Sequence, residues 1–310
     1  MLNSLFIFIV AMAMVIYGAT LATKYSAKLA EDFKLSKYII GFIVVAFISI
    51  LPEALISINS AFAGVPSLGL GTLFGSNVAD LTLVFAIIII FTGKEIKLES
   101  KILSNVNGYP FFLILPLFLG LNGYYSRLEG LLLIIVGGFF YYMVFKNDVN
   151  VSVSLEGGGK NKYKNILMLI LSMALLLVGS SFTVSSAVSI AGILSISPIL
   201  IGMLIVGLGT TMPELFFSLK SVQKGEDDLA VGDILGTVLA DATILVGVLA
   251  FIHPFYFPVK IIYITGIFML VASIILLTFM YTGQRISKKE GYLLLVFWII
   301  YVLTETIISG

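Results

Sequence analysis

The stretch Gly202-MLIVGLGTTMPELFF-Ser218 places a proline and then Glu214 inside an apolar run long enough to cross a bilayer. The same arrangement occurs 161 residues earlier, where a proline precedes Glu53 within Gly41-FIVVAFISILPEALI-Ser57. A charged side chain at membrane depth costs on the order of 3 kcal/mol on insertion scales, so it is a functional hypothesis by default. Two such carboxylates with matching surroundings predict one binding site assembled from two halves of the chain.

The repeat extends well beyond the two glutamates. Residues 41–86 and 202–247 align without a gap, and 13 of the 46 aligned positions are identical. The matched positions include a second pair of acidic residues as well as prolines, serines and glycines: Pro52 and Pro213, Ser57 and Ser218, Gly71 and Gly232, Gly75 and Gly236, and Asp80 and Asp241. A constant offset of this kind indicates two structurally equivalent halves.

The composition is that of a membrane protein. Hydrophobic residues make up 59% of the 310 residues, charged residues 11%, and the mean hydropathy is +1.12; these values lie far outside the range of soluble domains. A net charge of +1 gives no indication of nucleic-acid binding, the absence of cysteine excludes thiolate metal sites, and the single histidine, His253, argues against haem or zinc. We therefore expect membrane lipid and inorganic cations as partners, with no resident cofactor and no obligate protein partner.

Ten segments are apolar over roughly the 20 residues that a bilayer core of about 30 Å requires. They cover residues 5–23, 38–62, 68–93, 107–123, 128–146, 164–189, 195–222, 229–252, 258–282 and 288–308. The first has no basic region before it, so we interpret it as a membrane helix and not as a cleaved signal. The sequence thus predicts an all-α integral membrane protein with ten transmembrane helices: a first five-helix repeat over 1–146, a polar cytoplasmic linker over 147–163, and a second repeat over 164–310.

The basic residues predict the orientation in the membrane. Alternate loops carry 16 lysines and arginines, whereas the loops on the opposite side carry only Arg127 and Lys260. Because basic loops stay in the cytoplasm, we expect both termini outside, the linker inside, and the protein in the plasma membrane. Five helices per half is an odd number, so the second repeat should be inverted relative to the first, an architecture typical of secondary transporters.

The two repeated regions, 41–86 and 202–247, also predict a binding site lined by oxygen atoms. A proline inside a helix removes one backbone donor and clashes with the carbonyl four residues earlier, so the carbonyls at 46–48 and 207–209 should be bent or freed. Side chains four residues apart share a helix face, and four such stripes carry oxygen: Ser49, Glu53 and Ser57; Thr210, Glu214 and Ser218; Thr72, Ser76 and Asp80; and Asp233, Thr237 and Asp241.

An oxygen-only set of ligands suits hard cations. Calcium takes six to eight oxygens in flexible geometry, and sodium also accepts carbonyl and hydroxyl oxygens. Two glutamates supply the two negative charges that neutralise Ca²⁺, whereas without a cation they would repel each other in a low-dielectric site. A carrier of this kind should cross over only when it is filled or protonated, which is the physical basis of exchange.

Taken singly, several of these residues have structural interpretations. A membrane serine or threonine usually bonds back to its own backbone, and Gly71-x-x-x-Gly75 is typical of close helix packing. The acidic run 226–228 is interpreted as a solvated turn, with a cation-attracting vestibule as the alternative. The joint duplication of Pro-Glu, aspartate and hydroxyl at one offset favours an ion-binding site. Asp233 has Thr72 as its counterpart, and its role is open.

The motifs themselves are specific. The second repeat reads GTTMPE over 209–214 and GDILGTVLAD over 232–241, and the first reads ISILPE over 48–53 and GTLFGSNVAD over 71–80. They resemble the repeats of the cation/calcium antiporter superfamily, and within it those of the sodium/calcium exchangers, whose pattern is G-T-S-x-P-E followed by G-x-x-x-G-S-N-x-x-N/D.

The resemblance implies an antiporter that exchanges Ca²⁺ for Na⁺ by alternating access, with its first and sixth helices sliding across the others. It implies roles for nine residues: Glu53 and Glu214 as main calcium ligands, joined by the carbonyls of Ser49 and Thr210; Thr211 and Ser76 at a sodium site on one side and Thr237 on the other; and Asp80 and Asp241 at the centre.

Departures from the family pattern bear on the driving ion. Ile48 and Ile50 stand where the family has glycine and serine, which weakens one flanking sodium site. Asp80 stands where many sodium exchangers have asparagine, which pushes toward proton coupling or fewer sodium ions. The Asn-Ala-Thr-Glu signature of the proton/calcium branch is absent, so sodium remains the leading expectation and H⁺-driven transport the alternative. A cation channel, and an enzyme using Asp80 and Asp241 as an acid/base pair, are the weaker alternatives.

Overall fold

The computed structural model describes residues 2–30, 46–98, 108–148 and 162–309. This part of the chain is mostly α-helical, and eight of its helices are long and apolar enough to cross a membrane. Two shorter apolar helices cover Ala46–Phe62 and Tyr109–Asn122. Each of the ten predicted segments therefore coincides with a helix, although the start of the segment 38–62 and most of the linker 147–163 lie outside the described residues.

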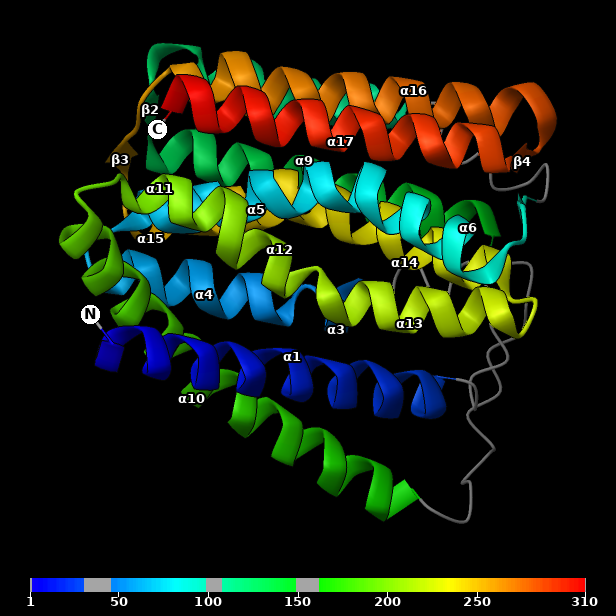
Figure 1. Cartoon of the computed structure of the whole chain (residues 1–310), viewed down its shortest axis with the longest axis horizontal. Helices are drawn as coiled ribbons and strands as arrows, with labels where there is room; N and C mark the ends of the chain where they lie inside the picture. Colours follow the sequence, from blue (N-terminus) through cyan, green and yellow to red (C-terminus); the bar gives the residue numbers. More distant parts are fainter. Residues whose placement is uncertain (1, 31–45, 99–107, 149–161, 310) are drawn as a thin grey trace.

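The helices run along the long axis of the molecule in parallel and antiparallel arrangement (Figure 1). At one edge, α1 (Leu2–Ala30) packs along α10 (Lys162–Leu194), and the two run in opposite directions. At the other edge, α16 (Ile267–Gly283) and α17 (Lys288–Ser309) also run in opposite directions, and α9 (Arg127–Asp148) lies nearer the middle of the view. The N- and C-terminal ends lie at the same end of the molecule.

Two helices of the core are interrupted just before their prolines. The first consists of α3 (Ala46–Ser49) and α4 (Leu51–Phe62), and the second of α12 (Gly207–Thr210) and α13 (Met212–Gln223). The breaks fall at Ile50 and Thr211, which are 161 residues apart, so the predicted bends are confirmed. The second helix is preceded by α11 (Pro198–Ile201) and the π-helical turn η5 (Gly202–Val206).

One part of the carbonyl prediction is wrong. The Gly207 carbonyl is not free, because it accepts from the Thr211 N–H at 3.1 Å and from the Thr210 and Thr211 hydroxyls at 2.9 and 3.0 Å. The Ala46 carbonyl likewise accepts from the Ile50 N–H at 3.0 Å. The broken turn satisfies these groups locally. The carbonyls that lose their helical donor are those four residues before each proline, at Ile48 and Gly209.

The helices that follow each break carry a wide turn at the same place. In the first half α5 (Pro66–Ala79) leads through η3 (Asp80–Val84) into α6 (Phe85–Thr92). In the second half α14 (Asp227–Ala240) leads through η6 (Asp241–Leu245) into α15 (Val246–Ile252). Both π-helical turns begin at the predicted aspartate. Such π-turns are rare and are often found at functional sites.

The remaining helical elements complete the apolar helices of the fold. They are α8 (Tyr109–Leu119), η4 (Gly120–Asn122), η7 (Ile262–Gly266) and α16 (Ile267–Gly283). Strand β1 (Ile96–Lys97) pairs antiparallel with β4 (Arg285–Ile286), and β2 (Tyr124–Tyr125) pairs antiparallel with β3 (Phe255–Tyr256). Each two-stranded sheet thus joins one strand from each half.

A pair of helix caps repeats at the same offset. The Glu129 carboxylate accepts from the backbone and hydroxyl of Ser126 at 2.8 and 2.7 Å, and the Glu129 N–H bonds back to the hydroxyl. Glu290 and Ser287 form the same capping box at the start of α17. Reciprocal bonds of this kind satisfy two unpaired donors of the first turn. The duplication therefore extends to local structure outside residues 41–86 and 202–247.

Small residues let α5 cross the second half at very short range. A Cβ atom on Gly71 would overlap the Ile199 carbonyl, and one on Gly75 would overlap the Met203 backbone. The prediction that this Gly-x-x-x-Gly pair is a packing surface is confirmed. For Gly232 and Gly236 it stays a prediction. This crossing brings the polar residues of α5 against the broken helix of the other half.

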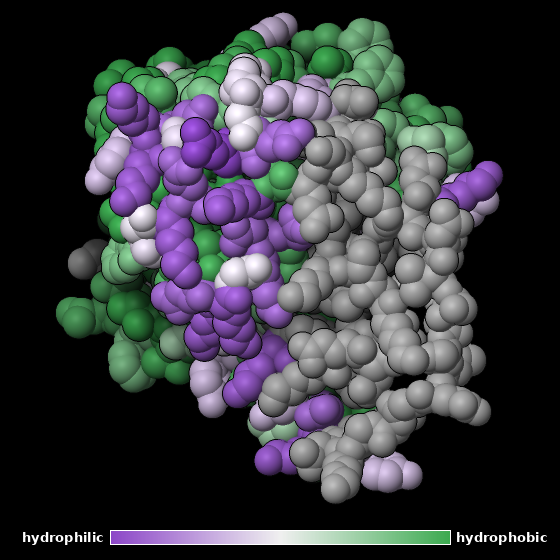
Figure 2. Space-filling model, turned by 90° about the vertical axis from the view of Figure 1, so that its right-hand side faces the viewer, coloured by the Kyte–Doolittle hydropathy of each residue, from purple (hydrophilic) through white to green (hydrophobic). Residues whose placement is uncertain are grey.

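The outer surface separates into apolar flanks and a polar end. Large hydrophobic side chains are exposed along α1, α9, α10 and α17, as expected of surfaces that face lipid. Hydrophilic residues gather at the end of the molecule seen in Figure 2. Residues of the loops predicted to be basic lie close together: Lys94 and Lys97 line one pocket with Glu226, Lys220 and Lys224 line another with Glu226, and Arg285 pairs with Glu95. The chain is a multi-pass membrane protein.

Candidate cation-binding site

The nine residues singled out from the sequence are all completely buried. Each has a relative exposure of 0%, and so has Asp233. They come from both halves, at or next to the helix breaks and the π-turns: Ser49 (α3), Glu53 (α4), Ser76 (α5), Asp80 (η3), Thr210 (α12), Thr211, Glu214 (α13), Thr237 (α14) and Asp241 (η6). The fold therefore places this set inside the helical core and not on a lipid-facing surface.

Acidic residues of the first half meet hydroxyls of the second. Thr210 lies beside the Glu53 carboxylate, and Thr211 lies beside Asp80. The hydrogens of both hydroxyls are donated to the Gly207 carbonyl. The hydroxyl oxygens keep lone pairs, which can serve as cation ligands next to the two carboxylates.

The reverse pairing occurs as well, with acids of the second half meeting hydroxyls of the first. Ser76 Oγ lies 3.3 Å from Asp241 Oδ2 and Ser49 Oγ donates to Asp233 Oδ1 at 2.9 Å. All four pairs join residues that are more than 130 positions apart in sequence. The two halves thus build one polar centre together, as the duplication predicts.

Most of the carboxylate oxygens in this centre have no hydrogen-bond donor among the described residues. This holds for both oxygens of Glu53, Glu214 and Asp80, and for one oxygen each of Asp233 and Asp241. The acids also lie close enough for their charges to interact, Glu214 with Glu53, Asp80 and Asp233. Buried negative charges without donors are costly. Cations or protons are the groups that can balance them.

The acids of the centre do not form a ready-made cluster for one metal ion. Among the described residues, no three acidic, histidine or cysteine side chains come together closely enough to hold a single metal ion. An arrangement of several neighbouring sites, each with one or two carboxylates completed by hydroxyls and carbonyls, fits this spacing. The pairing of Glu53 with Glu214 at one calcium ion stays a prediction.

The hydroxyl groups of Thr237 and Thr72 differ in whether they have a hydrogen-bond partner. Thr72 Oγ1 donates to the Leu68 carbonyl at 2.9 Å, the back-bonding that is usual for a membrane hydroxyl. Thr237 Oγ1 is buried without a partner among the described residues. Thr237 lies one turn before Asp241 and one turn after Asp233 on α14.

Sequence reasoning missed one buried acid altogether. Glu305 on α17 is 0% exposed, and its carboxylate accepts from the Thr265 hydroxyl of η7 at 3.0 Å. It has no counterpart in the repeat, because Val144 occupies the matched position. The only signal in the sequence is a carboxylate inside an apolar segment. Its partner Thr265 is not one of the predicted ligands, so Glu305 serves below as a matched control.

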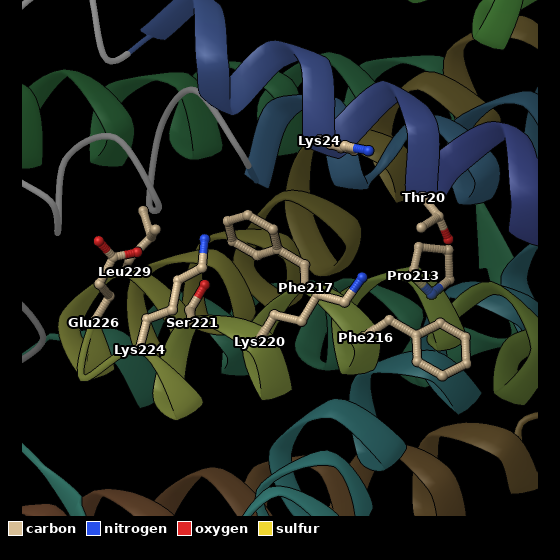
Figure 3. Close-up of a pocket in the computed structure, with 10 residues that line it drawn as sticks. All are labelled: Thr20, Lys24, Pro213, Phe216, Phe217, Lys220, Ser221, Lys224, Glu226 and Leu229. Carbon is tan, nitrogen blue, oxygen red and sulfur yellow. The ribbon is translucent and has the colours of Figure 1, made fainter.

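A cavity of about 520 Å³ leads from the polar end of the molecule toward this centre. Its walls come from α1 and from α13 with the turn that follows, and Figure 3 shows Lys24 of α1 across from Lys220 and Lys224. Its inner limit is Pro213, the residue before Glu214. Glu226 of the acidic run also lines it. This cavity supports the alternative interpretation of the acidic run as a cation-attracting vestibule. The three lysines that also line the cavity argue against it, because they would repel cations.

Comparison with known proteins identifies the class. The model of the sodium/calcium exchanger protein family matches the chain twice, over residues 3–146 and 164–307. The chain therefore belongs to the sodium/calcium exchanger protein family, a family of cation/calcium antiporters and not of enzymes.

Individual relatives agree with this assignment. CaxA of Alkalimonas amylolytica is 30% identical, covering 94% of this chain and 95% of its own. The sodium/calcium exchanger MaX1 of Methanosarcina acetivorans is 29% identical over 48% of this chain and 41% of its own length. Among solved structures, the sodium-calcium exchanger NCX_Mj, soaked with Na⁺ and Sr²⁺, has a TM-score of 0.73 at 24% identity, covering 97% of both chains. At that identity the likeness shows the fold.

Proposed function

We propose that this chain is a secondary antiporter that moves Ca²⁺ across the plasma membrane in exchange for Na⁺ by alternating access. The observation that carries the proposal is the buried centre, in which acids of each half lie beside hydroxyls of the other. Oxygen ligands alone, at several neighbouring positions, suit Ca²⁺ and Na⁺. The family assignment supports the same cargo.

The proposed calcium site consists of the Glu53 and Glu214 carboxylates with the backbone carbonyls of Ser49 and Thr210. Both glutamates are buried and without donors among the described residues, so two negative charges are available to one divalent ion. Both also begin the helix that follows a proline break. The prolines remove the helical donor from the carbonyls of Ile48 and Gly209, the residues directly before Ser49 and Thr210.

The proposed sodium sites flank this position. Thr211 and Ser76 would bind sodium on one side and Thr237 on the other, with Asp80 and Asp241 between them. Thr211 lies beside Asp80, and Ser76 lies beside Asp241, so each of these hydroxyls already has a carboxylate next to it. Because the same acids interact electrostatically with Glu53, sodium and calcium should compete for the shared negative charge.

We also propose ten transmembrane helices in two inverted five-helix repeats, with both termini outside. The antiparallel course of α1 and α10, the paired breaks and π-turns at an offset of 161, and the two matches to one family model support this arrangement. The polar end of Figure 2 would then face the cytoplasm. In such a carrier α1 and α10, which pack on each other beside the centre, would slide to open one side and then the other.

Calcium flux in proteoliposomes tests the proposal. Vesicles loaded with Ca²⁺ should release it on addition of external Na⁺, and Glu53→Gln and Glu214→Gln should each abolish release. Glu305→Gln removes a buried carboxylate that is not among the predicted ligands, and this variant should still release Ca²⁺. Release under neither a Na⁺ nor a pH gradient would refute antiport, and rates far above about 10³ s⁻¹, near the upper range of typical turnover numbers, would indicate a channel.

Proton-driven Ca²⁺ transport is the second candidate function. Five buried acids lie in or beside the centre, and Asp80 stands where many sodium exchangers have asparagine. The same vesicles distinguish the two, because a pH gradient imposed without Na⁺ would then drive Ca²⁺ release by itself.

A further inference from the structure

Asp233 is the one acid of the centre to which neither the repeat nor the family pattern gives a role. It lies on α14, is 0% exposed, and its Oδ1 accepts the Ser49 hydroxyl of α3 at 2.9 Å. Its Oδ2 is buried with no partner among the described residues. Half of this carboxylate is therefore engaged with the first half of the chain, and half is available to a ligand.

A second unpartnered oxygen lies on the same helix face. Thr237 follows Asp233 by four residues on α14, which brings their Cβ atoms within about 5–6 Å. Thr237 Oγ1 is buried and has no partner among the described residues. Since α14 packs against α3, the Ser49 hydroxyl oxygen is next to the Asp233 carboxylate as well. Two oxygen-bearing side chains on one face of α14 and the Ser49 hydroxyl of α3 thus lie near the break at Ile50.

The two halves differ at this place in a compensating way. In the second half the break carries the hydroxyl of Thr211, whereas the matched position in the first half is Ile50. The position matched to Asp233 is Thr72, whose hydroxyl is already bonded to the Leu68 carbonyl. Asp233 therefore lies beside the break at Ile50, where the hydroxyl ligand is missing. Its counterpart Thr72, whose hydroxyl is bonded to its own helix, belongs to the arrangement in which Thr211 supplies that hydroxyl.

We propose that Asp233, Thr237 and Ser49 form a separate monovalent-cation site, which in this chain is the sodium site on the Thr237 side of the centre. The inference rests on the proposed antiport function and names the residue that supplies the charge. One carboxylate balances one monovalent ion, and among the described residues Asp233 belongs to no cluster of three or more acidic, histidine or cysteine side chains that could hold a metal ion. The charge of Asp233 interacts with that of Glu53, which couples the site to calcium.

A purely structural role is the competing explanation. In that case the Asp233–Ser49 hydrogen bond would only hold the end of α3 at the break. Asp233→Asn separates the two roles, because the amide oxygen still accepts the Ser49 hydroxyl while the negative charge is lost. Thr237→Val removes the second oxygen with little change in volume, and gives an independent test if the first variant fails to fold.

The experiment measures Ca²⁺ release from proteoliposomes against external Na⁺. Asp233→Asn should raise the half-maximal Na⁺ concentration on the order of tenfold and lower the Hill coefficient, while the half-maximal Ca²⁺ concentration changes less than about twofold. Thr237→Val should shift the Na⁺ dependence in the same direction by less. Adding Ile50→Ser to Asp233→Asn should restore part of the Na⁺ affinity. Glu305→Gln should leave the Na⁺ dependence unchanged.

Binding is followed separately by Na⁺-dependent thermal stabilisation of the purified protein, with choline as the control cation. Asp233→Asn should move that dependence to higher Na⁺ concentration. An unchanged Na⁺ dependence in both Asp233→Asn and Thr237→Val would overturn the site. If the wild-type protein transports Ca²⁺ without any Na⁺ dependence, the proposed driving ion is wrong. If the wild type depends on Na⁺ and both variants show the same dependence, only the proposed site is wrong.

Discussion

Replacing Glu53 by glutamine should make the cation-free protein more stable while removing its response to calcium. Glu53 is 0% exposed, neither of its oxygens has a donor among the described residues, and it lies near the charges of Asp80, Glu214 and Asp233. A buried carboxylate without donors, close to other negative charges, destabilises the folded protein. The wild-type protein should therefore carry a local cost that a bound cation removes.

The size of the effect follows from these surroundings. A buried ion without a partner costs several kcal/mol, and a buried amide left without partners still costs about 1–3 kcal/mol. The difference predicts that Glu53→Gln gains about 1–3 kcal/mol in the absence of metal cations. At roughly 2–4 °C for each kcal/mol in domains of 150–250 residues, the melting temperature should rise by several degrees.

The assay is thermal unfolding of the purified protein in alkaline buffer, with and without Ca²⁺. Calcium at about 100 times its Kd should stabilise the wild type by about 2.7 kcal/mol and should not stabilise Glu53→Gln. Glu305→Gln, a buried acid that does accept a hydrogen bond, should keep the calcium response. A lower melting temperature for cation-free Glu53→Gln, or a retained calcium shift, would refute the reasoning.

Three further predictions concern the scaffold and can be checked by unfolding and flux on the same preparations. Gly75→Val should destabilise the protein by about 1–3 kcal/mol, because the added valine Cβ would overlap the Met203 backbone; an unaffected melting temperature would contradict the close approach of α5 to Met203. Ser126→Ala and Ser287→Ala should each cost about 0.5–2 kcal/mol, and similar values are expected since both form the same capping box; a clear effect of only one would argue against equivalent halves. Pro213→Ala supplies a donor for the Gly209 carbonyl and should leave stability equal or higher while it slows Ca²⁺ flux; normal flux would show that the break is not required.

The features that follow from local chemistry could be predicted from the sequence. The breaks at Ile50 and Thr211 follow from the prolines two residues later, and the buried position of Glu53 and Glu214 follows from their apolar surroundings. The close approach at Gly75 follows from its small size. In each case a short stretch of sequence determines the outcome.

Features that depend on distant partners could not be predicted. The π-turns at Asp80 and Asp241 have no simple sequence signature, although both occur at the repeated aspartates. The bond from Ser49 to Asp233 joins residues 184 positions apart and depends on how α14 packs against α3. The Gly207 carbonyl was expected to be free, but the two threonine hydroxyls that follow it fold back onto it.

The repeat pattern also directed attention away from Glu305. Because its matched residue is Val144, a search for duplicated acids does not find it, and only the structure shows that it is buried and bonded to Thr265. Asymmetry between the halves is thus as informative as their likeness. The same holds for Asp233 and Thr72, and for Ile50 and Thr211.

Calcium uptake into Na⁺-loaded proteoliposomes, with equal pH on both sides and the membrane potential clamped, tests the central claim most directly. The account predicts uptake that requires the outward Na⁺ gradient, stops when internal Na⁺ is replaced by choline, and is absent from Glu53→Gln and Glu214→Gln. Uptake of the same size with choline inside, or in either glutamine variant, would contradict it.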